Sequence, residues 1–140
     1  MKNIMCFLIL TLVFGCVKQD PSEQIAYIDG YWEIKSVTMP DGTKKEFKLS
    51  TTIDFIEVTA DSGMRKKVSP QLDGSFLTNN SVEKFSLKIE GDSLRMYYTT
   101  PFDSWKETVL EAKDSLLRVK NKDHKIYTYK RFSTFRIKQE

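Results

Sequence analysis

Few side chains in this sequence have the types and spacing that catalysis needs. His124 is the only histidine, and it lies in the polar stretch of residues 121–125, where an exposed turn is expected. The chain has no Gly-x-Ser-x-Gly motif, no phosphate-binding glycine loop and no His-Glu-x-x-His motif. Asp103 and Glu107 flank Trp105 as in some sugar sites, but packing of Trp105 into the core is the stronger interpretation. We therefore predict no enzymatic activity, no cofactor and no metal site.

Cys16 is the strongest candidate for a chemical modification, because this cysteine and the residues before it look like a bacterial lipobox. A single lysine, Lys2, precedes an apolar stretch from Ile4 to Phe14 that only one polar residue interrupts. This stretch has signal-peptide length and is shorter than the about 20 residues that span a bilayer. Gly15 and Cys16 follow at once. The resemblance implies cleavage after Gly15 and attachment of diacylglycerol to the Cys16 sulfur.

The number of cysteines agrees with this interpretation. Cys6 is the only other cysteine, and it would leave with the signal peptide, so Cys16 has no partner for a disulfide. We predict a signal peptide at residues 1–15, a lipidated tether at 16–29, and anchoring to a bacterial membrane, with the outer membrane favoured. An ordinary secretory peptide with an incidental Cys16 is the alternative. Which face of the membrane carries the protein stays open.

Charge excludes one large class of partners. The formal net charge is only +3, which is too small for a general nucleic-acid binder. Residues 113–140 hold nine Lys and Arg against three Asp and Glu. Solvation of the outer faces of the last strands is one explanation, and contact of these cations with an anionic partner, such as lipid headgroups or acidic glycans, is the other.

Strands are expected from residue 30 onward. Turn-forming residues recur about every ten residues, and residues 85–89 alternate between apolar and polar side chains as a half-buried strand does. The expected strands are 30–38, 53–58, 85–89, 94–98, 105–110, 116–120 and 126–132. The triplet Arg65-Lys66-Lys67 is interpreted as a solvated hairpin flank. The pattern predicts an antiparallel all-β sandwich or barrel, and the Cys–Trp–Cys spacing of immunoglobulin domains is absent.

Gly30, Trp32 and Arg131 favour the barrel. Gly-x-Trp in the first strand and an arginine at the end of the last strand resemble the lipocalins and their bacterial lipocalin-like relatives. The resemblance implies an up-and-down barrel of about eight strands over residues 30–140, with Arg131 stacked on Trp32 at the closed end. Lys130 takes that place if the register slips by one residue.

A short helix is expected in the tether. In lipocalins, a helix at this place in the chain covers one end of the barrel. Asp20 is placed as the N-cap, Pro21 as the first helical residue, and Glu23 as the partner in a capping box. Ile25 and Ile28 would share one face of this helix.

The interior decides between two functions. A barrel of eight strands either fills with side chains or leaves room for one small ligand. The predicted ligand-binding side chains, all expected to point inward, are Phe55, Phe85, Leu87, Met96, Tyr98, Trp105, Tyr127 and Tyr129. The first hypothesis is a monomeric, membrane-anchored protein of the cell envelope that binds a small apolar or amphipathic molecule. The alternative is a protein–protein or envelope-interaction module with a solid barrel.

Overall fold

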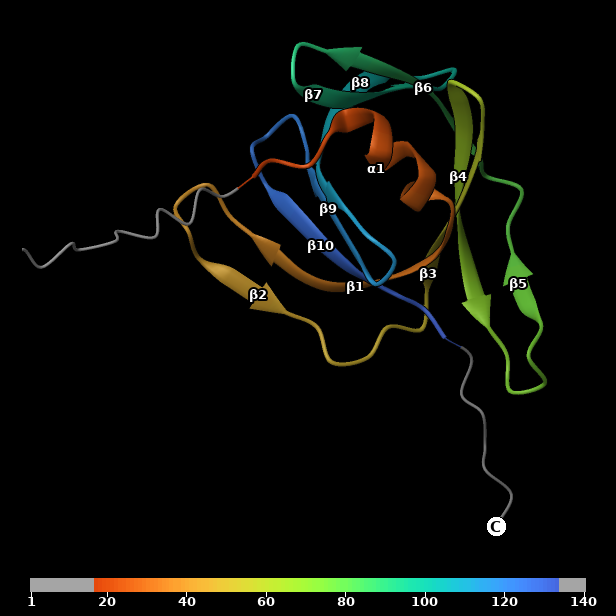
Figure 1. Cartoon of the computed structure of the whole chain (residues 1–140). Helices are drawn as coiled ribbons and strands as arrows, with labels where there is room; N and C mark the ends of the chain where they lie inside the picture. Colours follow the sequence, from red (N-terminus) through yellow and green to blue (C-terminus); the bar gives the residue numbers. More distant parts are fainter. Residues whose placement is uncertain (1–16, 134–140) are drawn as a thin grey trace, which may run out of the picture.

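The computed structural model describes residues 17–133, which form one helix and a closed antiparallel barrel (Figure 1). The elements are α1 Pro21–Ile28, β1 Gly30–Thr38, β2 Lys44–Glu46, β3 Ile53–Thr59, β4 Ser62–Pro70, β5 Phe76–Thr78, β6 Glu83–Glu90, β7 Ser93–Thr99, β8 Ser104–Ala112, β9 Leu116–Lys120 and β10 Ile126–Arg131. The eight barrel strands follow the order β1, β3, β4, β6, β7, β8, β9 and β10, and β10 pairs with β1 to close the ring. The predicted all-β, lipocalin-like barrel is confirmed.

Two short strands lie outside the ring and were not predicted. β1 pairs with β3 only through Gly30–Trp32 and then with β2 through Ser36–Thr38. In the same way, β4 pairs with β6 through its first four residues and with β5 through Val68–Pro70. β1 therefore separates from β3, and β4 separates from β6, toward one end of each strand pair. There β2 pairs with β1 and β5 pairs with β4, so the backbone groups left free are hydrogen-bonded (Figure 1).

Helix α1 covers one end of the barrel, as expected for the tether (Figure 1). Asp20 is the N-cap and Pro21 occupies the first turn. The Asp20 carboxylate accepts from the amide of Ser22 at 2.8 Å, whereas the capping box was expected to involve Glu23. Ile28 is fully buried. Ile25 packs against the same core, so the predicted shared face of the helix is confirmed.

The predicted pair of Arg131 and Trp32 is confirmed. These residues face each other across β1 and β10, and the guanidinium lies 4.2 Å from the centre of the indole ring. Gly30 has a φ of +126°, and a side chain there would collide with Arg131. Arg131 also donates to the carbonyls of Tyr27 at 3.1 Å and Asp29 at 3.0 Å, where α1 ends. One arginine therefore joins the helix to the first and last strands.

The half of the barrel interior next to α1 is filled by apolar side chains. Trp32 is completely buried, and its indole nitrogen donates to the carbonyl of Ile28 at 2.8 Å. The neighbouring buried residues are Leu87, Leu94, Met96, Val109, Ala112 and Leu117. We call this region the apolar half.

The opposite end of the barrel is the mouth. Its turns connect β1 to β2, β7 to β8 and β9 to β10, and the last of these contains Asn121–Lys125. His124 lies in this turn, exposed and with a positive φ of 61°, as its sequence context indicated.

Two side-chain directions assigned from the sequence are wrong. Phe55 lies on the outer wall, where its ring centre is 4.7 Å from that of Tyr31 and Lys66 lies over it. Its strand neighbours Asp54 and Ile56 are the inward residues, since side chains alternate along β3. Arg65 was expected in solvent, but its side chain is only 15% exposed.

The described residues contain no helix long and apolar enough to cross a membrane. The predicted signal peptide and Cys16 lie outside the described residues.

Candidate functional site

A hollow of about 240 Å³ opens at the mouth of the barrel, above the apolar half. Its lining comes from β4, β6, β8, β9, β10 and the turn after β9, and consists of Arg65, Lys67, Glu83, Trp105, Glu107, Val119, Asn121, Tyr127 and Tyr129. We call it the mouth hollow. Charged groups thus line it together with three aromatic rings, which differs from the dry cavity that a purely apolar ligand prefers.

Arg65 is the centre of the mouth hollow. Its Nη2 atom donates to Asp54 Oδ2 at 2.7 Å and to the Tyr129 hydroxyl at 2.8 Å. Its Nη1 atom lies 3.6 Å from Glu107 Oε2. Lys67 forms an ion pair with the other oxygen of Asp54. The guanidinium is thus held by groups from β3, β8 and β10, so its position depends on barrel closure.

Strand alternation explains why this cluster points inward. On β4, Gly63, Arg65 and Lys67 alternate with Met64 and Lys66, which face outward. A side chain at Gly63 would collide with the ring of Phe85 on β6. The glycine therefore lets this buried ring pack against the β4 backbone.

Two carboxylates of the cluster have opposite pKa shifts. Burial opposes ionisation of Asp54, but the positive charges of Arg65 and Lys67 outweigh burial and lower its pKa. Burial raises the pKa of Glu107, and the nearby charge of Glu83 adds to this effect, while Arg65 offsets only part of it. Asp54 is therefore the stable counter-ion of Arg65, whereas Glu107 takes up a proton more readily than an exposed glutamate.

Burial also raises the pKa values of the Tyr98 and Tyr129 hydroxyls. Both phenols therefore stay protonated at physiological pH. The Tyr129 hydroxyl accepts a hydrogen bond from Arg65 and so retains its own proton for donation into the site.

The predicted ligand-binding side chains fall into three groups. Phe85, Leu87, Met96 and Tyr98 are buried in the packed core. Trp105, Tyr127 and Tyr129 line the mouth hollow. The Trp105 ring stacks on that of Tyr98 with centres 5.0 Å apart and planes 5° apart, so it also borders the core.

Phe55 alone lies on the outer wall. The charged members of the mouth hollow were missed by sequence reasoning. The available signal was the polar alternation of β4, in which Arg65 and Lys67 share a face with Gly63.

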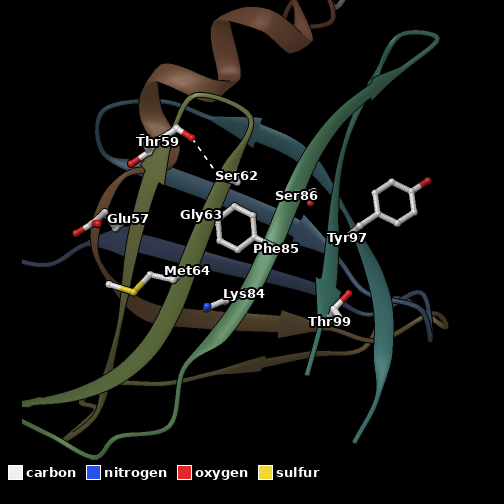
Figure 2. Close-up of a pocket in the computed structure, with 10 residues that line it drawn as sticks. All are labelled: Glu57, Thr59, Ser62, Gly63, Met64, Lys84, Phe85, Ser86, Tyr97 and Thr99. Atoms are coloured by element: carbon white, nitrogen blue, oxygen red, sulfur yellow. Dashed lines mark hydrogen bonds between the residues drawn. The ribbon is translucent and has the colours of Figure 1, made fainter. Parts of the chain in front are cut away.

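The outer wall carries two further hollows. One of about 450 Å³ crosses β3, β4, β6 and β7, and Figure 2 shows its lining, which includes Glu57, Met64, Lys84 and Tyr97. The other, of about 670 Å³, lies between Leu49–Thr51, Pro70–Leu72 and the end of β10. Leu72 is fully exposed there.

Metal ligation has no support in residues 17–133, where no group of three or more His, Cys, Asp and Glu side chains is placed to hold an ion. Asp103 lies apart from Glu107, 4.0 Å from the ammonium group of Lys122 on the exposed rim. Trp105 packs against the core, which agrees with the stronger interpretation of the sequence, whereas the alternative of a sugar site between the two carboxylates is not supported by any contact among the described residues.

The chain is similar in sequence to a protein family and in structure to two solved proteins. A family model described as "Lipocalin-like domain" matches residues 28–119. A lipocalin-like protein from Bacteroides uniformis ATCC 8492 is similar in structure, with a TM-score of 0.46 and 13% sequence identity over 74% of this chain and 97% of that one. An uncharacterized protein from Bacteroides eggerthii DSM 20697 gives a TM-score of 0.46 and 12% identity over 74% and 98% of the two chains. A search of curated protein sequences gives no match.

Proposed function

Because the chain belongs to the lipocalin-like domain family, whose members are typically non-enzymatic binding proteins, we propose that it binds a small amphipathic molecule at the barrel mouth. The observation that carries this proposal is the mouth hollow itself. Charged side chains form one part of its lining and aromatic rings form the other.

The two parts of the hollow suit the two parts of such a ligand. Arg65 and the Tyr129 hydroxyl are held in place before a ligand arrives, so a polar head would find oriented partners. Trp105 and Tyr127 offer ring surface to an apolar body. The ligand must be small, because the apolar half below is filled and the hollow measures about 240 Å³.

Binding is tested with two matched substitutions. Glu107→Gln changes the charge of the mouth hollow, whereas Glu57→Gln makes the same change in the outer hollow of Figure 2. The protein and both variants are purified from their own membranes and examined by native mass spectrometry. We expect a bound small molecule in the wild type, retained in Glu57→Gln and reduced in Glu107→Gln. Loss in Glu57→Gln alone would move the site to the outer wall.

The second part of the proposal is the lipid anchor at Cys16. It is supported by the lipobox-like sequence that precedes and includes this residue. Cys16→Ser is expected to accumulate as an unprocessed precursor that incorporates no labelled fatty acid. Normal processing and labelling of this variant would contradict the anchor.

An interaction module remains the second candidate function, favoured by one observation on the outer wall. Leu49 is 83% exposed and Leu72 is fully exposed beside the hollow of about 670 Å³. Apolar side chains presented in this way suit a protein partner. Replacing both by serine would abolish crosslinking to such a partner and leave ligand retention unchanged.

A further inference from the structure

We propose that the α1 end of the barrel faces the lipid surface and that the mouth points away from it. The inference rests on the proposed lipid anchor at Cys16 and adds the surface by which the protein meets the membrane. It is carried by contacts that fix the first described residues to the barrel.

Gln19 fixes the tether to β8. Its side-chain nitrogen donates to the carbonyl oxygen of Ala112 at 2.6 Å, and its side-chain oxygen accepts from the amide of Ala112 at 3.1 Å. The amide side chain therefore satisfies both backbone groups of one residue, as a neighbouring strand would. Lys18 adds an ion pair with Asp92 in the turn between β6 and β7, at 3.0 Å. Since this pair is largely exposed, the Gln19 contact is the main restraint.

The reach of the tether decides the orientation. Cys16 precedes Gln19 by three residues, so even an extended chain keeps its Cα atom within roughly 11 Å of the Cα atom of Gln19. β8 has nine residues from Ser104 at the mouth to Ala112 at the α1 end, a length of about 27 Å along the strand. The tether is therefore too short to carry an acyl anchor to the mouth while Gln19 is bound.

The lysines of the last strands and their turns either lie toward the mouth or pair with a carboxylate. Lys130, at the end of β10 near α1, pairs with Glu33 at 3.4 Å. Lys122 and Lys125 belong to the turn between β9 and β10, at the mouth. Lys122 lies 4.0 Å from Asp103. Lys113 is near the α1 end but pairs with Glu111 at 2.7 Å. The acyl chain, not a basic patch, would therefore hold the barrel at the membrane, and the mouth hollow would open toward the aqueous side.

The two tryptophans provide a test, because Trp32 lies under α1 and Trp105 lines the mouth hollow. The chain from Cys16 onward contains a single cysteine, which is coupled to a maleimide lipid in vesicles that also contain a dansyl-labelled lipid. Energy transfer to dansyl is compared between the wild type and Trp105→Phe. If the mouth points away from the membrane, Trp105 is the donor farther from the dansyl groups. Its removal should therefore raise the mean transfer efficiency per tryptophan. An unchanged or lower efficiency would overturn the proposed orientation.

A matched pair of insertions tests the role of the tether. A ten-residue Gly-Ser insertion after Val17 leaves Gln19 in contact but lengthens the free chain, so the difference between wild type and Trp105→Phe should shrink. The same insertion after Ser133 should leave the difference unchanged. Because the lipid is attached chemically, failure of this test is distinguishable from failure of Cys16 to be lipidated in the cell.

Discussion

The same strands form both halves of the barrel interior, but one half is packed with apolar side chains and the other holds charged ones. Beside α1, Trp32, Leu94 and Leu117 are at most 1% exposed and belong to the apolar core, where the indole hydrogen bond and the stacked Arg131 are the polar contacts of Trp32. At the mouth, the side chain of Asp54 is 2% exposed and that of Arg65 is 15% exposed, and both carry full charges. The apolar half gains free energy from burial, whereas the mouth half is stable only while every charge keeps its partner.

The apolar half of the interior contributes mainly to stability, whereas the mouth half is the proposed place of ligand binding. A packed apolar region has no group left to recognise a ligand, whereas the mouth hollow keeps oriented donors next to open volume. The substitutions below test whether the two halves differ in this way.

The largest loss is expected in the apolar half. Trp32→Ala should lower the free energy of unfolding by about 3–5 kcal/mol, because a fully buried ring leaves a cavity. Urea unfolding followed by circular dichroism measures the loss. Trp105→Ala is the control at the mouth and should cost less, since that ring is only partly buried. Equal losses would show that the two halves do not differ in stability.

The next effect is expected where a buried charge loses its partner. Asp54→Ala should cost about 2–3 kcal/mol, because Arg65 would lose its shortest ion pair in a poorly solvated position. Asp103→Ala is the matched control, since this carboxylate is exposed beside Lys122 and should change stability by a few tenths of a kcal/mol. A loss for Asp54→Ala no larger than that of the control would show that the mouth charges are individually dispensable.

A smaller effect is expected at the clamp between α1 and the barrel. Arg131→Ala should cost about 1–2 kcal/mol, mainly through the lost cation–π contact with Trp32. Lys130→Ala is the control, because its pair with Glu33 at 3.4 Å is half exposed. A double-mutant cycle with Trp32→Ala should give non-additive losses. Strict additivity would contradict the contact.

The smallest effect is a difference in pH dependence within the mouth. The pKa of Asp54 is lowered below 3.8, so its stabilisation is present above that pH and is lost as pH falls through the folded-state pKa. The pKa of Glu107 is raised above 4.5, so the folded state takes up its proton first and stability increases as pH falls through that pKa, levelling off below 4.5.

Urea unfolding between pH 7 and pH 3 measures both slopes. Glu107→Gln should remove the increase in the free energy of unfolding as pH falls. Asp54→Asn should remove the decrease in that free energy at the acidic end. Slopes of the same sign for the two variants would contradict the opposite shifts.

The apolar half was largely predictable from the sequence. Gly30, Trp32 and Arg131 marked the closed end, and the first and last strands were expected within one residue of their observed bounds. Leu117 precedes Arg118 in the alternating stretch of β9 and is buried. These residues obey the simple alternation of apolar and polar side chains, so each strand reveals its own inner face.

The mouth half was not predictable in the same way. Arg65 looks like a surface residue because its partners Asp54, Glu107 and Tyr129 come from other strands, and no short stretch of sequence shows them together. Phe55 looks like a core residue, yet the register of β3 turns it outward, since a shift of one residue exchanges the two faces of a strand. Pairing between distant strands, rather than local pattern, decides both positions.

The clamp formed by Arg131 also has a kinetic consequence. It joins the end of β10 to the carbonyl of Asp29, 102 residues earlier in the chain, and it forms only when the last strand reaches the first. Pairing over such a separation is slow, because a long loop must be closed before the contact contributes. Until β10 arrives, β1 presents an unpaired edge to which other chains can add. We therefore expect pairing of β10 with β1 to be a late step of folding, before which the β1 edge is open to aggregation.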